Sequence, residues 1–491
     1  MRPTYSRLLA LSSVLFAVAS GTHAAVDSRY GGTLRVEVRA ANISFDPREW
    51  KAGSLDSATN EKLAALLFER LVALDNYGRF QPLLATEWSH DASNKRWQFT
   101  IRAGVRFTDG AVLTVADVAA ALQPLLSASE QISASGSAIV IQSSVPAPDM
   151  LEQLASGRYF VYRALATGAI VGTGPFVLVE TPATGHLSFR ANEEAWSGRP
   201  FVNAIDVLLG VPPLRAMFDL QLGKADLIEL APELVPRARQ ASLRVWASEP
   251  ATLYALRLDG TQGATSDEHL REALSLSLDR DTMANVLLQK EADPAAALLP
   301  QWLSGYAFLF HADANLERAK ELRHLLDANE AVAAAPLRLQ VDPAGDLAKL
   351  LGERVAVNAR QAGILVQVIN HPVPHAGTAA PVSSEATSGV HLFAWHYSSL
   401  SPRVELDSMF AAYNLTETSD ANAASADREQ LYARERQVLE EWRVLPLVTE
   451  AEFTGLNPIV RDWIPGRWGE WHLADVWLDL PEPAAASGAK P

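Results

Sequence analysis

The sequence predicts a mixed α/β protein that is built from two or three packed units. Its 491 residues exceed one ordinary hydrophobic core, because single domains usually hold about 50–250 residues. Apolar residues alternate over 337–341, and a β-branched run covers 364–369. Between them, helical spacing over 347–362 ends at Gly363, a residue type common just past helix ends. This strand–helix–strand order is typical of an α/β lobe.

The N-terminal third predicts two strands and two helices. Apolar residues alternate with polar ones over 33–39 and again over 97–101, which is the period of a half-buried strand. Residues 61–74 are predicted to form an amphipathic helix with a leucine-rich side. Thr114 is followed three positions later by Asp117, an arrangement that resembles a capping pair and predicts the start of a helix.

The middle and C-terminal parts predict further helices between loops. Residues 127–149 hold few large apolar side chains, so we expect a loop-rich edge there with one short strand over 138–142. Residues 267–290 are predicted to form two helices, and Asp279 is expected to cap the second. Another amphipathic helix is predicted over 427–443.

The first 24 residues have the three parts of a secretory signal. Arg2 and Arg7 give a positive start, and residues 8–20 form a short apolar core. Small residues precede Ala24, so we expect cleavage after that residue and a soluble periplasmic protein. The apolar core of about 13 residues is too short to span a bilayer comfortably, and an uncleaved membrane anchor is the less favoured alternative.

Composition excludes several classes of function. The chain contains no cysteine, which excludes disulfides, thiolate metal ligands, cysteine nucleophiles and a lipid anchor on an N-terminal cysteine. Its formal net charge is −15, and it becomes −17 when Arg2 and Arg7 leave with the signal. A nucleic-acid partner requires a basic face, so this balance argues against one. No second apolar run reaches the roughly 18 residues that a membrane span needs.

No catalytic motif stands out. The chain lacks His-Glu-x-x-His, Gly-x-Ser-x-Gly and the phosphate-loop lysine pattern. Residues 172–176 contain two glycines before a predicted strand, which indicates close backbone approach or a positive φ. A dinucleotide fingerprint would need a third glycine where Val177 stands, so phosphate binding is not favoured. We therefore expect no enzyme, no cofactor and no resident metal.

A set of short segments, spread along the chain in order, carries a family resemblance. The most specific segment is 82–88, followed by 97–110 and 114–118. The others are 32–35, 69–72, 172–176, 223–226, 270–280, 319–322 and 445–447. Together they closely resemble the signature of the family 5 extracellular solute-binding proteins, the capture subunits of peptide and nickel ABC importers. Their order and spacing cover nearly the whole mature chain, which makes the resemblance specific.

The resemblance implies an α/β, two-lobed periplasmic-binding-protein clamshell with a discontinuous first lobe and a small inserted subdomain. The first lobe would combine residues 25–43, 171–250 and 447–481. The inserted subdomain would cover residues 44–170, the second lobe residues 251–446, and a disordered tail residues 482–491. A ligand would bind between the lobes, and a hinge motion would close them around it.

The implied function is that of the periplasmic substrate-binding component of an ABC importer. It would capture a peptide or peptide-like solute as a monomer and deliver it to the permease and ATPase subunits of an inner-membrane complex. Peptide-binding members hold their ligand as an extended strand through main-chain hydrogen bonds. Two alternatives on the same fold are a non-transport sensor or chaperone, and a protein that binds a metal chelate.

One position departs from the peptide-binding members of this family. Those relatives carry an aspartate shortly after a tryptophan in the second lobe, and its carboxylate pairs with the α-amino group of the ligand. Here Trp395 is followed by Ser398 at that position, and a serine cannot neutralise an enclosed ammonium. The nearest acids, Glu405 and Asp407, are expected to lie beyond the site. Either another carboxylate anchors the amine, or the ligand has no free N-terminus.

Six residues are the predicted ligand contacts: Phe45, Asp46, Trp395, His396, Tyr397 and Ser398. Phe45 and Asp46 follow the first strand, where relatives approach the cleft. Asp46 is the candidate partner for a cationic group, although forming a turn before Pro47 is the simpler role. Trp395 and Tyr397 share one face of a strand-like segment, where they would either stack on a ligand or fill the core.

Two further groups of residues allow either a ligand role or a structural role. His391 and His396 would suit nickel or copper, but a buried hydrogen bond is the favoured interpretation. His371 and His375 lie in a predicted loop over 371–388 and are expected to be solvated. Five tryptophans lie late in the chain, and core packing is favoured over a ligand platform. They are Trp442, Trp463, Trp468, Trp471 and Trp477.

Overall fold

The computed structural model describes most of the chain in eight stretches. These are residues 28–165, 168–180, 185–260, 263–326, 336–341, 345–370, 389–415 and 427–480. The predicted signal, the loop that holds His371 and His375, and the predicted tail all lie outside the described residues. Within the described stretches, no helix is both long enough and apolar enough to cross a membrane.

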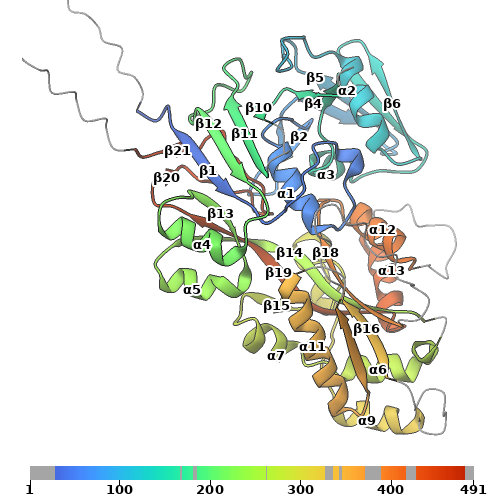
Figure 1. Ribbon diagram of the computed structural model, residues 1–491. Helices are drawn as coiled ribbons and strands as arrows, with labels where there is room; N and C mark the ends of the chain where they lie inside the picture. Colours follow the sequence, from blue (N-terminus) through green and yellow to red (C-terminus); the bar gives the residue numbers. More distant parts are fainter. Residues whose placement is uncertain are drawn as a thin grey trace, which may run out of the picture.

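Two long antiparallel strands join both lobes into one sheet. β14 (Arg244–Leu258) and β19 (Val444–Leu456) lie in the middle of this 11-stranded sheet. The strand order is β10–β11–β12–β1–β13–β19–β14–β18–β16–β17, and β15 pairs with β19 off this path. Figure 1 shows the sheet passing from the first lobe through β14 and β19 into the second lobe.

The first lobe holds the strands on the β13 side of the sheet. They are β1 (Thr33–Glu37), β10 (Phe176–Glu180), β11 (His186–Ala191), β12 (Ala204–Leu208) and β13 (Leu227–Leu230). Its helices are α4 (Pro213–Gln221) and α5 (Val235–Gln240), and a C-terminal pair, β20 (Val460–Arg461) and β21 (Trp477–Leu478), completes it. β1 lies parallel to both β12 and β13, and its Leu34 and Val36 are in the core.

The second lobe holds the strands on the β18 side and most of the helices. Its strands are β15 (Ala292–Pro294), β16 (Leu337–Val341), β17 (Val366–Asn370) and β18 (Val390–His396). Its helices are α6 (Glu268–Ser277), α7 (Arg280–Thr282), α8 (Gln301–Ser304), α9 (Leu316–Leu325), α11 (Gly345–Gln361), α12 (Pro402–Tyr413) and α13 (Arg428–Glu440). Hydrophobic cores form on both faces of these strands.

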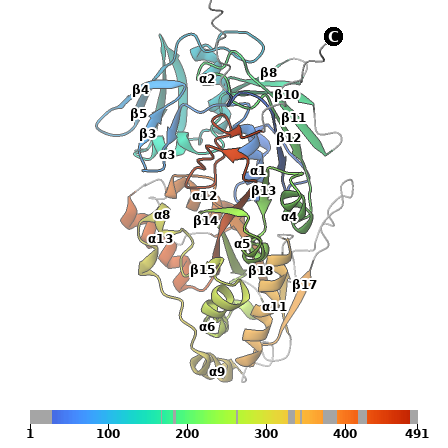
Figure 2. The ribbon, with the colours of Figure 1, turned by 90° about the vertical axis from the view of Figure 1, so that its left-hand side faces the viewer.

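The inserted subdomain contains a four-stranded sheet in the order β4–β5–β7–β6, the two-stranded pairs β2–β3 and β8–β9, and its own core. Its helices are α1 (Leu55–Ala64), α2 (Val115–Leu122) and α3 (Met150–Ala155). Its strands are β2 (Val72–Leu74), β3 (Phe80–Pro82), β4 (Ala85–His90), β5 (Arg96–Ile101), β6 (Glu130–Ser135), β7 (Ala138–Ser143), β8 (Tyr162–Ala164) and β9 (Ile170–Gly172). Figure 2 shows this unit beside β10–β12 and above the second lobe.

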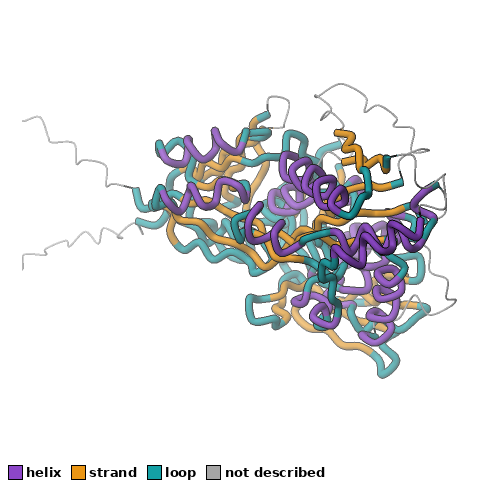
Figure 3. The backbone as a smooth tube through the Cα atoms, turned by 90° about the horizontal axis from the view of Figure 1, so that it is seen from below, coloured by secondary structure: helices purple, strands orange, loops and turns teal. Residues whose placement is uncertain are grey.

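The crossing between the lobes is irregular in its pairing. The register of β14 against β19 shifts between Ala247 and Pro250, between Pro250 and Thr252, and between Tyr254 and Ala255. The predicted lobe boundaries at 250/251 and 446/447 fall inside these two continuous strands. Figure 3 shows helices grouped around the strands that run through the body of the molecule. Interrupted pairing at the crossing is where strands can bend, because bulges weaken the ladder locally.

The prediction of one helix over 61–74 is wrong. α1 begins six residues earlier and ends at Ala64, and 72–74 form β2. The reason is that the leucines of this stretch serve two cores rather than one helix face. The turn after α1 also receives the glycine-rich 172–176 segment: a Cβ at Gly172 or Gly174 would lie 2.2 or 2.5 Å from backbone atoms of Leu67. This confirms the close backbone approach expected there.

The edge predicted over 127–149 has one more strand than expected. β6 pairs with β7 as an antiparallel hairpin. Most side chains of β6 are exposed, so the strand lacks the apolar alternation that would reveal it in the sequence. Other local predictions are confirmed: Thr114 and Asp117 form a reciprocal capping box on α2, Asp279 caps α7, and the helix expected over 427–443 is α13.

Replacing Gly53 should destabilise the contact between the loop before α1 and β18. A Cβ there would lie 2.2 Å from the Trp395 ring, and φ is +74°. We expect Gly53→Ala to lower the free energy of unfolding by roughly 1–3 kcal/mol more than Gly78→Ala, because overpacking adds to the backbone strain. Gly78 is the matched control, since φ is +76° and nothing lies within 4 Å. Urea denaturation measures both, and equal losses would contradict the packing argument.

Candidate ligand-binding site

A cavity of about 70 Å³ lies where both lobes and the inserted subdomain meet. α1 contributes Glu61 and Lys62, and the segment after α3 contributes Ser156. Residues 396–400 enter from the end of β18, and residues 468–472 enter from the chain beyond β19. Because these segments belong to different units, the cavity is enclosed only when the lobes lie together.

Aromatic side chains form much of the cavity wall. The ring centroids of Trp302 and Trp468 are 5.9 Å apart, and Trp302 meets Tyr397 edge-on at 6.4 Å. Trp471 and Phe160 are buried and also line the cavity. Rings in this arrangement can pack on the apolar part of a solute or on a cation.

A buried lysine connects the inserted subdomain to the first lobe and to β19. Lys62 Nζ lies 2.9 Å from Glu452 Oε2 and 3.5 Å from Glu229 Oε1, and 5.2 Å from the centroid of the Trp471 ring. Burial alone would lower the pKa of Lys62, but the two glutamates outweigh it and raise the pKa. The ammonium therefore stays charged in the interior of the protein.

Carboxylates crowd the remainder of the cavity. Burial raises the pKa of Glu61 to about 8. The Arg70 cation opposes this rise, and repulsion from other carboxylates, those of Glu405, Glu452 and Glu470, adds to it. Glu61 thus carries a proton at neutral pH. Arg70 is held against the backbone by a 2.7 Å hydrogen bond from Nη1 to the carbonyl of Ala155. With Glu61 protonated, two further acids, Glu452 and Glu470, line the cavity beside its two cations, Lys62 and Arg70.

Four polar atoms at the cavity have no hydrogen-bond partner among the described residues. They are His396 Nδ1, Trp468 Nε1, Trp471 Nε1 and Glu470 Oε2. Most buried polar atoms in proteins are paired, because an unpaired one costs about 1–3 kcal/mol. Burial also lowers the pKa of His396, so its imidazole is neutral at pH 7. The hydrogen-bonding capacity of two indole donors and one carboxylate oxygen is thus unused among the described residues.

Comparison with known proteins agrees with this architecture. Residues 79–415 match the family model described as bacterial extracellular solute-binding proteins, family 5 Middle. The chain belongs to this family. The family 5 resemblance found in the sequence is therefore confirmed, and the sensor or chaperone alternative is not favoured, since curated relatives are described as nickel- or peptide-binding proteins.

Individual relatives of this family 5 protein are distant. The nickel-binding periplasmic protein of Escherichia coli K12 is 22% identical over 345 residues, which cover 62% of this chain and 66% of the relative. The probable di/tripeptide-binding protein 5 of Pseudomonas aeruginosa is 24% identical over 323 residues, which cover 56% of this chain and 60% of the relative. The chain thus spans somewhat less than two thirds of the length of these two relatives.

A solved structure shows the fold over a longer stretch. The dipeptide-binding protein of Pseudoalteromonas sp. SM9913, in complex with Met-Leu, aligns with a TM-score of 0.75 at 16% identity. The alignment covers 91% of this chain and 100% of that one. The predicted α/β clamshell fold is confirmed by this likeness and by the sheet order.

The family 5 segment after β18 places three predicted contacts at the cavity and one behind it. His396, Tyr397 and Ser398 line the cavity, while Trp395 is 1% exposed and does not. Trp395 Nε1 donates to Glu405 Oε1 at 2.6 Å, and Glu405 Oε2 accepts from the backbone N–H of Ser399 at 2.8 Å. Glu405 therefore lies directly behind the lining, nearer than expected, with its carboxylate already occupied.

Phe45 and Asp46 lie away from the cavity. Neither is among the residues that line it, and Phe45 packs edge-on against Phe189 in the first-lobe core. The Asp46 carboxylate caps the turn before Pro47, pairs with Arg48 and accepts a hydrogen bond from the Tyr162 hydroxyl. The Arg48 hydrogen bond is the main reason that the pKa of Asp46 lies below its usual value. The structure thus gives Asp46 the simpler of its two predicted roles.

The paired-histidine metal site is not formed. His391 and His396 are five positions apart on β18, whose pairing with β14 is regular. Side chains five apart on a strand point to opposite faces and lie roughly 17 Å apart along it. The described residues also contain no group of three or more His, Cys, Asp or Glu side chains that could hold a metal ion.

Most residues that line the cavity were not predicted as ligand contacts, among them Glu61, Lys62, Trp468, Glu470 and Trp471. No sequence pattern singles out the two on α1, where the predicted helix over 61–74 has the wrong bounds. The two tryptophans were assigned to core packing, which holds for Trp471 in part because it also belongs to the first-lobe core. The sequence offers one indication of this part of the cavity, which is that two tryptophans flank Gly469 and Glu470. That pattern is unusual for a strand in a core.

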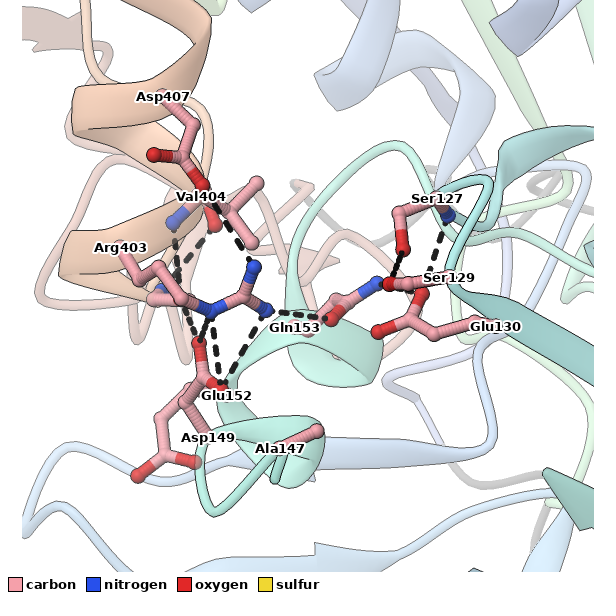
Figure 4. A network of polar contacts seen from close by, with 12 residues as sticks. Ser127, Ser129, Glu130, Ala147, Asp149, Glu152, Gln153, Arg403, Val404 and Asp407 are labelled. Atoms are coloured by element: carbon pink, nitrogen blue, oxygen red, sulfur yellow. Dashed lines mark hydrogen bonds and ion pairs between the residues drawn. The ribbon is translucent and has the colours of Figure 1, made fainter. Parts of the chain in front are cut away.

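A second contact between the inserted subdomain and the second lobe is a buried ion pair. Arg403 Nε on α12 lies 3.1 Å from Asp149 Oδ2 at the start of α3, and the Ser401 hydroxyl donates to the same carboxylate. Gln153 accepts a further hydrogen bond from Arg403 at 3.4 Å. Figure 4 shows Arg403 between Asp149 and Gln153, with Asp407 from its own helix on the other side. This contact joins the inserted subdomain to the second lobe.

Breaking this pair should open the lobes. We expect Asp149→Asn to increase the radius of gyration of the ligand-free protein in small-angle X-ray scattering, because Arg403 loses its partner across the lobes. Asp407→Asn is the matched control, since Asp407 contacts Arg403 at 3.6 Å from within the same helix. An increase of the same size in both variants would show that the pair has no role in closure.

The raised pKa of Glu61 predicts that stability falls as pH rises. Its folded-state pKa is about 8 against an ordinary value of 4.5, so between these values only the folded state keeps the proton. The stabilisation is complete below pH 4.5 and is lost as pH rises through 8. We expect Glu61→Gln to lose less stability than wild type between pH 5 and 8 in chemical denaturation, while the exposed Glu87→Gln control keeps the wild-type slope. Identical slopes for wild type and Glu61→Gln would refute the assignment.

Proposed function

We propose that this chain is the periplasmic substrate-binding component of an ABC importer, which captures a small peptide or peptide-like solute between its lobes. The observation that carries the proposal is the enclosed cavity, whose polar atoms on several units have no partner within the protein. A solute that pairs with them binds the closed form more tightly than the open form. Such a difference in affinity is what drives closure.

The size of the cavity supports a short solute. A cavity needs roughly 10–15 Å³ to hold one water, so about 70 Å³ corresponds to about five waters. A long peptide would require a much larger space between the lobes. Entry and release require the lobes to separate, and the irregular pairing of β14 with β19 supports bending at that point.

The acid that replaces the missing aspartate is Glu470. Ser398 lines the cavity but offers no charge, whereas Glu470 Oε2 is buried there without a partner. An ammonium group of the solute would pair with Glu470 and lie near the faces of Trp468 and Trp471. The indole N–H groups would donate to oxygen atoms of the solute, and His396, Tyr397 and Ser398 would complete the contacts.

The proposal includes the cellular setting. The protein acts in the periplasm as a soluble monomer without a lipid anchor, after its predicted signal is removed, and binds no nucleic acid. It hands the solute to the permease and ATPase subunits of an inner-membrane complex and performs no chemistry on it. The family description as extracellular solute-binding proteins and the names of the relatives support this setting.

The first test is native mass spectrometry of residues 25–491 purified gently from the periplasm. A bound mass that fragments as a short peptide or amino-acid derivative supports the proposal, and its closure should appear as a smaller radius of gyration. A bound metal chelate would redirect the proposal to that solute class. A protein that stays empty and shows no thermal shift with peptide, amine and chelate libraries would overturn the capture function.

Glu470→Gln should weaken solute binding while leaving the fold intact. The change removes one negative charge but keeps the shape, and a hydrogen bond to a charged group contributes about 1.5–3 kcal/mol. We therefore expect the dissociation constant measured by calorimetry to rise roughly 10- to 100-fold. The exposed Glu87→Gln variant should match wild type. Unchanged affinity in Glu470→Gln would exclude Glu470 as the amine partner.

A further inference from the structure

A second, larger cavity lies behind the Lys62–Glu452 ion pair. Its volume is about 620 Å³, and Lys62 and Glu452 line both cavities, so their contact forms part of the wall between them. The second cavity also joins the lobes. Glu229 and Glu233 enter from β13 and the segment that follows it, and Asp346 enters from the first turn of α11.

The charges that line the second cavity are unbalanced. Its acids are Asp56, Glu229, Glu233, Asp346, Glu450 and Glu452, and its bases are Arg39 and Lys62. Lys62 already pairs with Glu229 and Glu452. Burial and repulsion from Glu229 raise the pKa of Asp56, as expected where negative groups crowd together. A cation entering this cavity would relieve that repulsion.

Glu450 gives an independent indication of a ligand. Its side chain on β19 is 9% exposed and lines the cavity, and its Oε2 atom has no hydrogen-bond partner among the described residues. Burial raises the pKa of Glu450 to about 7, which the Arg39 cation and Tyr254 oppose and repulsion from Glu233 and Glu452 reinforces. Burying a carboxylate oxygen without a partner is costly, so a donor supplied by a ligand would stabilise it.

The spacing of the acids favours an extended organic cation over a metal ion. A divalent ion needs several oxygen ligands at about 2–2.6 Å, and no such group of acidic side chains exists in the described part of the chain. The acids are instead distributed around a cavity of ligand size, between apolar lining residues such as Leu55, Pro213 and Leu347. A flexible aliphatic chain with amines several atoms apart matches the separated acids through its amines and the apolar lining through its methylene groups.

We propose that the second cavity binds a linear aliphatic polyamine, with one ammonium group on Glu450 and others on Glu233 and Asp346. The polyamine would contact the first lobe through Glu233 and the second lobe through Asp346. It would therefore fix the relative position of the lobes from behind the ion pair, at a site separate from that of the captured solute.

Isothermal titration calorimetry with spermidine at physiological salt tests this site. We expect one saturable site, and a dissociation constant that rises at least 10-fold in Glu450→Gln. Glu233→Gln and Asp346→Asn should each weaken binding several-fold. Both residues are exposed, so the weaker binding of these variants would not be explained by misfolding. The exposed Glu87→Gln variant is the control for general attraction to an acidic protein and should bind as wild type does.

The outcomes separate this site from its alternatives. Absence of saturable binding, or equal weakening in all variants including Glu87→Gln, would overturn the proposal in favour of non-specific attraction. Magnesium binding that is as tight as spermidine binding and equally sensitive to Glu450→Gln would overturn the choice of ligand class. Mass spectrometry of the solute retained by Glu450→Gln should match wild type, and loss of that solute would show that the two cavities are one site.

Discussion

The buried ammonium of Lys62 is the interaction on which the arrangement of the lobes depends. It reaches from α1 in the inserted subdomain to Glu229 on β13 and Glu452 on β19, and Trp471 covers it. A charge in the interior requires such partners, because its desolvation costs several kcal/mol. The requirement fixes the inserted subdomain against the central strands, and the two cavities lie on either side of the contact.

Electrostatics distinguishes the two cavities. At the first cavity Glu61 keeps a proton, which leaves Glu452 and Glu470 beside one lysine and one arginine. The second cavity is lined by six acids and two bases, so a positive group bound there would relieve repulsion between the acids. The Arg403–Asp149 pair is a separate contact between the inserted subdomain and the second lobe.

Mechanical freedom comes from a different feature, the two strands shared by both lobes. β14 and β19 carry the chain across the hinge, yet their pairing shifts register at three places near the crossing. Continuous strands keep the lobes aligned, while interrupted pairing lowers the resistance to bending. Segments beyond these strands, at 396–400 and 468–472, meet at the first cavity.

The sequence by itself determined the fold class, the family and many local elements, because these depend on short-range patterns. The capping box of Thr114 and Asp117 and the cap at Asp279 are examples. Only the tertiary structure decided which acids line the cavity. No local pattern marks Glu470 or Lys62, whereas Asp46 is a candidate partner for a cationic group in the sequence, with a turn before Pro47 as its simpler role. Their roles follow from burial and from partners far away along the chain, which no local pattern records.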